Sequence, residues 1–341
     1  MADDSPRRRK VRGKKVRSDR QSKENRRAKK RVARAGKNGD GDSAGDAELT
    51  APEAVLPEPF VQTEEVESIK GRITGWLEAD QPVHLIGPTG CGKTALALSA
   101  AAERDRPVVW INGDESVDTS SLVGEHAGGE RYEEDDRFVS GVHKHTEIVR
   151  ERWVDNPLSV AAREGATLVY NEFSRSPPAA HNVLLTLFEE GVLERPGKRG
   201  EDRTIDVHPD FRAIVTSNTV EYAGVHDQQD ALLDRFVGVH VDYYDAETER
   251  EVVRAHVDLP EERVEEVVGA TRRLRDELEV AVGTRAAITA GKGLETFGAG
   301  EGLENGLLAG VFTDVLAPKV AGDGELDGLR SEIESILTDD G

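Results

Sequence analysis

The residues best suited to do chemistry form one glycine-rich run, Gly87-Pro88-Thr89-Gly90-Cys91-Gly92-Lys93-Thr94. The run matches the pattern G-x-x-x-x-G-K-[ST] and lies between a short apolar stretch and an Ala/Leu-rich stretch that predicts a helix. Glycines let the backbone wrap around phosphate oxygens, and the N–H groups and the helix N-terminus supply positive potential there. We expect Lys93 to reach the β and γ phosphates and Thr94 to ligate Mg²⁺ through its hydroxyl. The run therefore predicts a phosphate-binding loop for ATP with Mg²⁺.

A polar pair, Asn171-Glu172, follows the apolar run 166–170. In phosphate-loop ATPases a carboxylate at this place holds Mg²⁺ through water, and the adjacent glutamate polarises the attacking water. Glu172 is available as that base, but Asn171 stands where the aspartate is expected. An amide oxygen still accepts a hydrogen bond from a metal-bound water, but it adds no negative charge. We therefore expect active but slow hydrolysis, and the alternative is a nucleotide switch that barely turns over.

Asn218 is a further candidate because it directly follows the apolar run 211–216 and Ser217. An amide at the end of a strand can hold the lytic water and sense the γ-phosphate. Asparagine at a strand end is also an ordinary turn former. Both interpretations stay open on the residues alone.

Short apolar runs predict the elements that must position these side chains. Five of them read as buried strands of a parallel sheet: 83–86, 108–111, 166–170, 211–216 and 236–241. Helical patterns between them indicate a doubly wound α/β fold, in which ligands bind at the carboxyl ends of the strands. After residue 245 the patterns predict only helices, near 246–257, 261–280, 286–297, 303–317 and 325–337.

Three regions follow from this reading. We expect a disordered tail over 1–55, a nucleotide-binding α/β core over 56–244 and a small helical lid over 245–341. The stretch between Glu194 and Val207 is charged and hairpin-like. The insertion between the second and third strands carries His126, His143 and His145 and is predicted to be a loop. Histidines without rigid helical spacing indicate solvated side chains rather than a metal site.

The charge of the chain is unevenly distributed. Its formal net charge is -21, yet residues 1–37 contain 17 lysines and arginines against 4 acidic residues, so the remainder carries -34. The basic block is suited to docking on an acidic partner or a nucleic acid. The acidic, lysine-poor body argues against a nucleic-acid channel. It is typical of proteins from salt-in halophiles, whose carboxylates keep the surface hydrated. Thermal stability should then rise from dilute buffer to molar KCl, and a flat response would contradict that origin.

Three features that the sequence lacks predict the cellular compartment: a membrane span, a signal peptide and a pair of cysteines. No apolar run approaches the ~18 residues of a membrane span, and the first residues lack the apolar stretch of a signal peptide. Cys91 is the only cysteine, so an intrachain disulfide is excluded. We expect a cytoplasmic protein.

The order of several motifs resembles that of MoxR-type AAA+ ATPases. The matching segments are 87–94, 168–172 followed by Pro177-Pro178, 192–194, 216–218, 232–236 and 283–286. Within that family the chain is most similar to the branch that holds the NorQ, CbbQ and gas vesicle N proteins. Residues 138–170 resemble the gas vesicle group in particular. The resemblance covers about 57–320 and depends on the order and spacing of the motifs, since no single motif decides it.

The resemblance implies roles that composition does not show. Asn218 matches the family's sensor 1, Arg235 its arginine finger and Arg285 its sensor 2. An arginine finger acts in the site of a neighbouring subunit. A homo-oligomeric ring, a hexamer, is therefore implied, and the insertion with the histidines would face the ring pore or a partner. The structural alternative for Arg235 is a surface salt bridge with Asp230 or Asp234.

The functional expectation is an ATP-driven remodelling factor that assists gas vesicle assembly and acts on vesicle structural or accessory proteins. Three alternatives remain. The first is a chaperone that activates a metalloenzyme, as implied by the NorQ and CbbQ relatives. The second is a weakly hydrolysing, nucleotide-dependent scaffold, prompted by Asn171. The third is a nucleic-acid ATPase, prompted by the basic tail. Fold alone does not choose the client.

Overall fold

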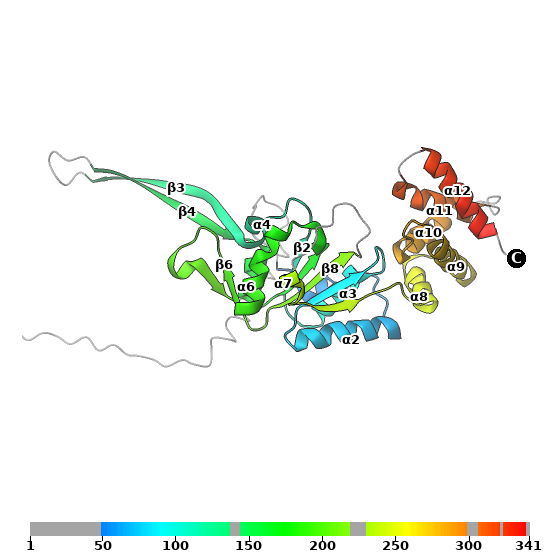
Figure 1. The fold of residues 1–341 in the computed structure, drawn as a ribbon, viewed down its shortest axis with the longest axis horizontal. Coiled ribbons are helices and arrows are strands. Elements are labelled where there is room, and N and C mark those ends of the chain that lie inside the picture. The colour runs from blue at the N-terminus through cyan, green and yellow to red at the C-terminus, as the bar shows by residue number, and fades with distance from the viewer. Residues whose placement is uncertain (1–48, 137–143, 219–229, 299–305, 321–322, 339–341) are drawn as a thin grey trace, which may run out of the picture. The chain divides into compact units, whose positions relative to one another are not determined.

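A computed structural model describes residues 49–136, 144–218, 230–298, 306–320 and 323–338. The central element is a five-stranded sheet in the order β2-β5-β8-β1-β9 (Figure 1). Its strands are β1 (Val83–Gly87), β2 (Val108–Asn112), β5 (Thr167–Asn171), β8 (Arg212–Asn218) and β9 (Val237–His240). All four pairings are parallel. The predicted five-stranded parallel sheet is confirmed.

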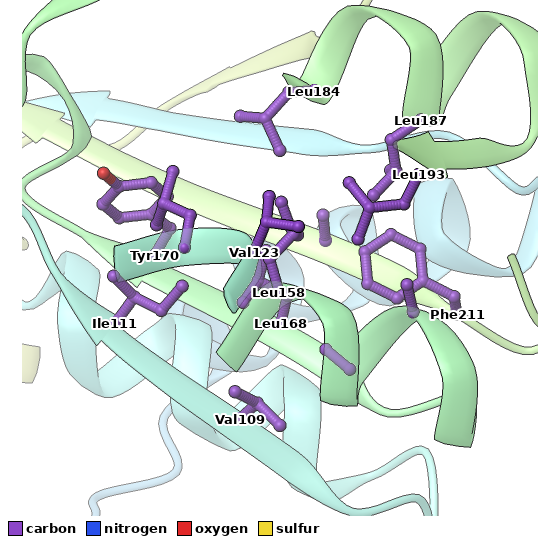
Figure 2. Packing of buried hydrophobic residues seen from close by; sticks show 14 of the residues in the cluster. Val109, Ile111, Val123, Leu158, Leu168, Tyr170, Leu184, Leu187, Leu193 and Phe211 are labelled. Atoms are coloured by element: carbon purple, nitrogen blue, oxygen red, sulfur yellow. The ribbon is translucent and has the colours of Figure 1, made fainter. Parts of the chain in front are cut away.

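Alternation along the strands divides the apolar residues between two faces of the sheet. On β8, Ala213 and Val215 belong to one buried cluster and Ile214 to the other. The first cluster is closed by α5 (Pro157–Glu164) and α6 (Asn182–Glu190), which contribute Leu158, Leu184 and Leu187 (Figure 2). The second is closed by α2 (Glu64–Glu78) and α3 (Lys93–Ala102). Helices therefore cover both faces of the sheet, so a polar ligand can reach the sheet only at the ends of its strands.

The elements of the α/β part connect these strands. Its helices are α2 (Glu64–Glu78), α3 (Lys93–Ala102), α4 (Thr119–Val123), α5 (Pro157–Glu164), α6 (Asn182–Glu190) and α7 (Asp230–Leu233). Single turns occur at η1 (Pro52–Ala54), η2 (Phe173–Arg175), η3 (Pro178–His181) and η4 (Gly200–Arg203). The strands β6 (Val192–Glu194) and β7 (Thr204–Asp206) pair antiparallel, so the predicted hairpin before Val207 is confirmed.

The C-terminal part is helical, as predicted. It consists of α8 (Ala246–His256), α9 (Glu261–Glu277), α10 (Thr284–Phe297), α11 (Leu307–Leu316), η5 (Ala317–Lys319) and α12 (Asp323–Thr338). These helices share an apolar cluster of their own, which includes Phe312 and Ile333, both without exposed surface. A separate core is what a distinct lid requires. No helix in the described ranges is long and apolar enough to cross a membrane.

The insertion between β2 and β5 differs from the prediction. It forms two long antiparallel strands, β3 (Gly124–Asp136) and β4 (Lys144–Asp155), rather than a loop (Figure 1). Its many charges and glycines hide the alternation by which strands are recognised. In the register His126 pairs with Trp153 and His145 with Asp135. These positions are nine residues apart along the ladder, or roughly 30 Å, so they do not form one site. His143 lies outside the described residues.

The tail prediction also needs a correction at its end. Residues 1–48 lie outside the described part, but residues 49–55 are structured. Thr50 pairs with Val108 through two backbone hydrogen bonds, 3.0 and 2.8 Å long. Leu49 packs against the first apolar cluster. Because β2 is an edge strand, this pairing satisfies backbone groups that would otherwise be open.

Candidate active site

The phosphate loop joins β1 to α3, as its sequence predicts. Gly90 and Gly92 have φ angles of 83° and 93°, in the left-handed region that favours glycine. Gly92 caps the N-terminus of α3. The loop therefore points backbone N–H groups and the helix N-terminus toward one place, which is the arrangement that binds phosphate.

Lys93 lies at the start of α3 with only 7% of its surface exposed. Its ammonium donates hydrogen bonds to the carbonyl oxygens of Gly87 at 2.9 Å and Pro88 at 2.6 Å. Burial lowers the pKa of Lys93, and nearby Arg285 acts in the same direction. These carbonyls are weak partners for a full charge, so a phosphate oxygen would compete well for the ammonium.

Asn171, the last residue of β5, is the centre of a hydrogen-bond network that joins β2, β5, β8 and α3. Its Oδ1 accepts from the hydroxyls of Thr94 at 2.8 Å and Thr216 at 2.9 Å. Its Nδ2 donates to Oδ1 of Asn112 at 3.2 Å. An aspartate at this place would face Asn112 Oδ1 with a second oxygen, unless the Asn112 amide turned. The amide at 171 is thus matched to its neighbour on β2.

Glu172 follows Asn171 in a left-handed conformation, with φ of 52°. A non-glycine residue there costs about 1 kcal/mol or more, and a hydrogen bond from Glu172 N to Thr216 Oγ1, 3.1 Å long, holds it. The carboxylate is paired with Arg175 at 2.5 Å, and the pair is exposed. The candidate base therefore has a partner that must release it before it can take a proton.

Asn218 ends β8 and lies opposite Gly87 in the register with β1. The preceding Ser217 has its Oγ 2.7 Å from Nε2 of His84. Burial lowers the pKa of His84 to about 4, and His240 adds to the effect. His84 is therefore neutral at neutral pH and supports the strand end beside Asn218.

One cavity of about 370 Å³ collects most of the predicted site residues. From the phosphate loop, Thr89, Gly90, Gly92, Lys93 and Thr94 line it, and Asn171, Glu172, Asn218 and Arg285 line it as well. The other three predicted loop residues, Gly87, Pro88 and Cys91, are not among its lining residues. Arg285 comes from the start of α10, and the described residues provide its guanidinium with no carboxylate partner. The lid thus adds the positive charge of Arg285 to the same cavity as the phosphate loop.

The apolar part of this cavity was not predicted from the sequence. It is lined by Pro57, Pro59, Phe60, Val61, Val66, Leu98, Val252 and Ile288. Tyr244 and His256 also line it. The run Pro59-Phe60-Val61, which ends two residues before the N-terminal cap of α2 at Thr63, is the one signal that could have indicated an apolar wall. The size of the cavity and its mixed apolar and polar lining fit a purine base beside a phosphate site.

Arg235 lies elsewhere. It lines a different cavity of about 360 Å³ together with Asp80, Arg212 and Asp234. Its guanidinium pairs with Glu189 of α6 and donates to the carbonyl oxygen of Ala231 at 3.1 Å. The salt bridge with Asp230 or Asp234 is therefore the wrong alternative, since Glu189 is the partner. Arg235 does not enter the chain's own phosphate site.

The residues fit a nucleotide and a metal ion. Thr89 Oγ1 is buried in the phosphate loop, and no described residue gives it a hydrogen bond. A ligand in the loop would supply the missing partner. For Mg²⁺ the hydroxyl of Thr94 and Oδ1 of Asn171 are oxygen donors, the type that this ion prefers. Both are neutral. Among the described residues no group of three or more histidines, cysteines and carboxylates could hold a metal by itself.

Comparison with known proteins decides the family. The gas vesicle ATPase GvpN of Haloferax mediterranei is 54% identical over 339 residues, which cover 98% of this chain and 97% of the relative. The chain belongs to the GvpN family of ATPases. GvpN2 of Halobacterium salinarum is also 54% identical, over 99% of this chain and 98% of its own. The family model for the AAA domain of the dynein-related subfamily matches residues 82–236.

A more distant relative links the GvpN family to the wider group. The protein CbbQ of Hydrogenophilus thermoluteolus is 28% identical over 215 residues, which cover 62% of this chain and 73% of that protein. The resemblance to the branch of CbbQ and the gas vesicle N proteins is confirmed. As a GvpN-family member with an AAA domain, the chain is a nucleotide-binding ATPase, as the phosphate loop predicts.

Proposed function

We propose that this chain binds ATP with Mg²⁺ in the 370 Å³ cavity and uses its hydrolysis to remodel proteins during gas vesicle assembly. The observation that carries the proposal is the convergence of the phosphate loop, Glu172, Asn218 and Arg285 on that one cavity. Each supplies a different part of phosphoryl transfer to water: phosphate binding, a base, water positioning and charge stabilisation.

The catalytic residues divide the work between them. The loop N–H groups and Lys93 bind the β and γ phosphates, and Arg285 approaches from the lid. Thr94 and Asn171 would hold Mg²⁺, which when bound neutralises charge on those phosphates. Glu172 takes the proton of the attacking water once Arg175 has released its carboxylate, and Asn218 orients that water.

Arg235 completes the site from a neighbouring subunit. Arg235 does not line the nucleotide cavity of its own chain, and its guanidinium is paired with Glu189. We assign it to the nucleotide of the next subunit in a homo-oligomeric ring, a hexamer, where it stabilises charge on the transferring phosphoryl group. The α/β core over 56–244 and the lid over 245–341 are the two proposed domains that meet at each site.

The proposed clients are structural or accessory proteins of the gas vesicle. Support comes from the names of the relatives, which are gas vesicle ATPases at 52–54% identity over nearly the whole chain. The proposed place of action is the cell interior, at growing vesicles.

Gene replacement tests the vesicle assignment. The gene of the Haloferax mediterranei relative would be replaced by this chain, or by its Lys93→Ala variant, at matched protein levels. We expect wild type to support gas vesicles, counted by electron microscopy, and Lys93→Ala to support few or none. A wild-type chain that hydrolyses ATP in extracts but makes no vesicles would contradict the assignment.

Asn171 supports a second candidate, a nucleotide-dependent scaffold that barely hydrolyses. The metal donors are neutral, and the carboxylate of Glu172 is occupied by Arg175. Tight ATP binding without steady-state phosphate release would favour this scaffold over the remodelling enzyme.

A further inference from the structure

The lid contains a carboxylate with no exposed surface, Glu249 of α8. Arg275 binds it through two nitrogens, with Nη2 at 2.6 Å from Oε1 and Nη1 at 3.2 Å from Oε2. Arg272 Nη1 lies 3.0 Å from Oε2. The hydroxyl of Thr284 donates to Oε1 at 2.9 Å. Four hydrogen bonds from three side chains therefore saturate one buried carboxylate.

Burying these charges has a large desolvation cost, so the cluster is a poor way to increase the stability of the fold. A buried ion cluster often adds no more stability than apolar residues of the same volume, whereas removing one partner is strongly destabilising. Its clearest use is to fix one geometry among several. The question is which geometry this cluster fixes.

The cluster fixes the start of α10. Thr284 is the first residue of that helix, and Arg285 is the next. Arg275 also donates from Nε to the carbonyl oxygen of Val282 at 2.7 Å. The chain is thus held on both sides of Gly283, and the direction of Arg285 into the nucleotide cavity follows from it.

The cluster also reaches the phosphate loop. The guanidinium of Arg275 stacks over the ring of Tyr243, 4.0 Å from its centre. The Tyr243 hydroxyl donates to the carbonyl oxygen of Thr89 at 3.3 Å. Arg272 donates to the carbonyl oxygen of Tyr244, whose side chain lines the nucleotide cavity. One buried carboxylate therefore connects the lid arginine to the loop that binds phosphate.

We propose that Glu249 is a positioning residue for ATP hydrolysis. By engaging Arg272, Arg275 and Thr284, it directs Arg285 toward the phosphates of the bound nucleotide and couples the lid to the phosphate loop. The inference rests on the proposed function, because it assigns Arg285 to the nucleotide. Glu249 acts through Arg285 and does not touch ATP.

A double-mutant cycle tests the proposal. Wild type, Glu249→Gln, Arg285→Ala and the double variant would be compared for steady-state phosphate release and for the Kd of the fluorescent analogue mant-ATP in molar KCl. We expect Glu249→Gln to lower kcat about tenfold in the wild-type background. In the Arg285→Ala background, Glu249→Gln should lower kcat less than about twofold, because the guanidinium that Glu249 positions is already absent.

A matched control separates positioning from general damage. Glu334→Gln makes the same change in an exposed lid pair with Arg330 on α12, and it should leave kcat and Kd unchanged. If circular dichroism shows that Glu249→Gln does not fold, Thr284→Val takes its place in the cycle, since it removes only the bond between the cluster and α10.

The outcomes are distinct. Equal losses of kcat in both backgrounds, or no loss in either, would overturn the positioning role. If wild type binds mant-ATP but releases no phosphate, the proposed hydrolysis fails. The Kd values of the four proteins for mant-ATP then provide the test. Additive effects of Glu249→Gln and Arg285→Ala on the free energy of mant-ATP binding would overturn the positioning role.

Discussion

Gly283 of the lid lies directly against Gly90 of the phosphate loop. A Cβ built on Gly283 would stand 2.7 Å from the carbonyl oxygen of Thr89 and 3.1 Å from Cα of Gly90. Real Cβ atoms do not approach backbone so closely, so one of the two segments would have to move. The contact brings Arg285, two residues further on, beside the phosphate loop, where its Cβ lies 3.7 Å from a Cβ built on Gly90.

Gly283→Ala should therefore weaken nucleotide binding. We expect the Kd for mant-ATP to rise about tenfold, since overpacking of about 1–3 kcal/mol is relieved by moving the lid from the loop. Gly310→Ala is the control, because a Cβ at that lid helix position meets no atom within 4 Å. An unchanged Kd for Gly283→Ala would show that the contact is not needed.

Asn171→Asp should strengthen Mg²⁺ binding. The new charge would lie beside the Thr94 hydroxyl, which is 2.8 Å from Oδ1. We expect the Mg²⁺ concentration for half-maximal phosphate release to fall several-fold and kcat to rise. The Asn112 amide must turn to donate to the carboxylate. A lower kcat at saturating Mg²⁺ would indicate that the amide network, and not the charge, is what the site requires.

Arg235 should act in trans. Arg235→Ala and Glu172→Gln should each be nearly inactive alone, with losses of about 10³-fold for the finger. In a 1:1 mixture about one quarter of ring interfaces would pair an intact base with an intact finger from the neighbour. Phosphate release should return in the mixture in that proportion. A mixture as inactive as its components would contradict the shared site.

His84 should make the fold sensitive to acid. Its pKa is about 4 in the folded chain against 6.5 in the unfolded chain, so the unfolded state binds the proton first. The associated stability is present above pH 6.5 and is lost as the pH falls through 4, a total of roughly 3 kcal/mol. His84→Gln keeps a polar group for Ser217 and removes the titration. Urea unfolding should show a shallower loss between pH 6.5 and 4 for the variant. Identical slopes would contradict the assignment.

The sequence predicted those parts of the fold that depend on local patterns. The strands at Val83, Val108 and Thr167 are short apolar runs, and such runs in an α/β chain indicate a parallel sheet. The phosphate loop is recognised because its chemistry needs fixed residue types at fixed spacing. The strand ends then bring Asn171 and Asn218 to one edge.

Features that depend on long-range contacts were missed. Both β3 and β4 are rich in charged residues, and β3 also contains three glycines, so neither shows clear alternation. The partner of Arg235 is Glu189, 46 positions earlier in the chain, whereas sequence reasoning looked to its neighbours. The pairing of Asn171 with Asn112, and of Glu249 with three lid residues, likewise joins segments that no local pattern connects.

Steady-state phosphate release by the purified chain in molar KCl, measured alongside mant-ATP binding, tests the central claim most directly. We predict that wild type binds and hydrolyses, that Lys93→Ala does neither, and that Glu172→Gln binds but hydrolyses about 10²–10⁴ times more slowly. Wild-type turnover by Lys93→Ala or by Glu172→Gln would contradict the assignment of this cavity as the ATPase site.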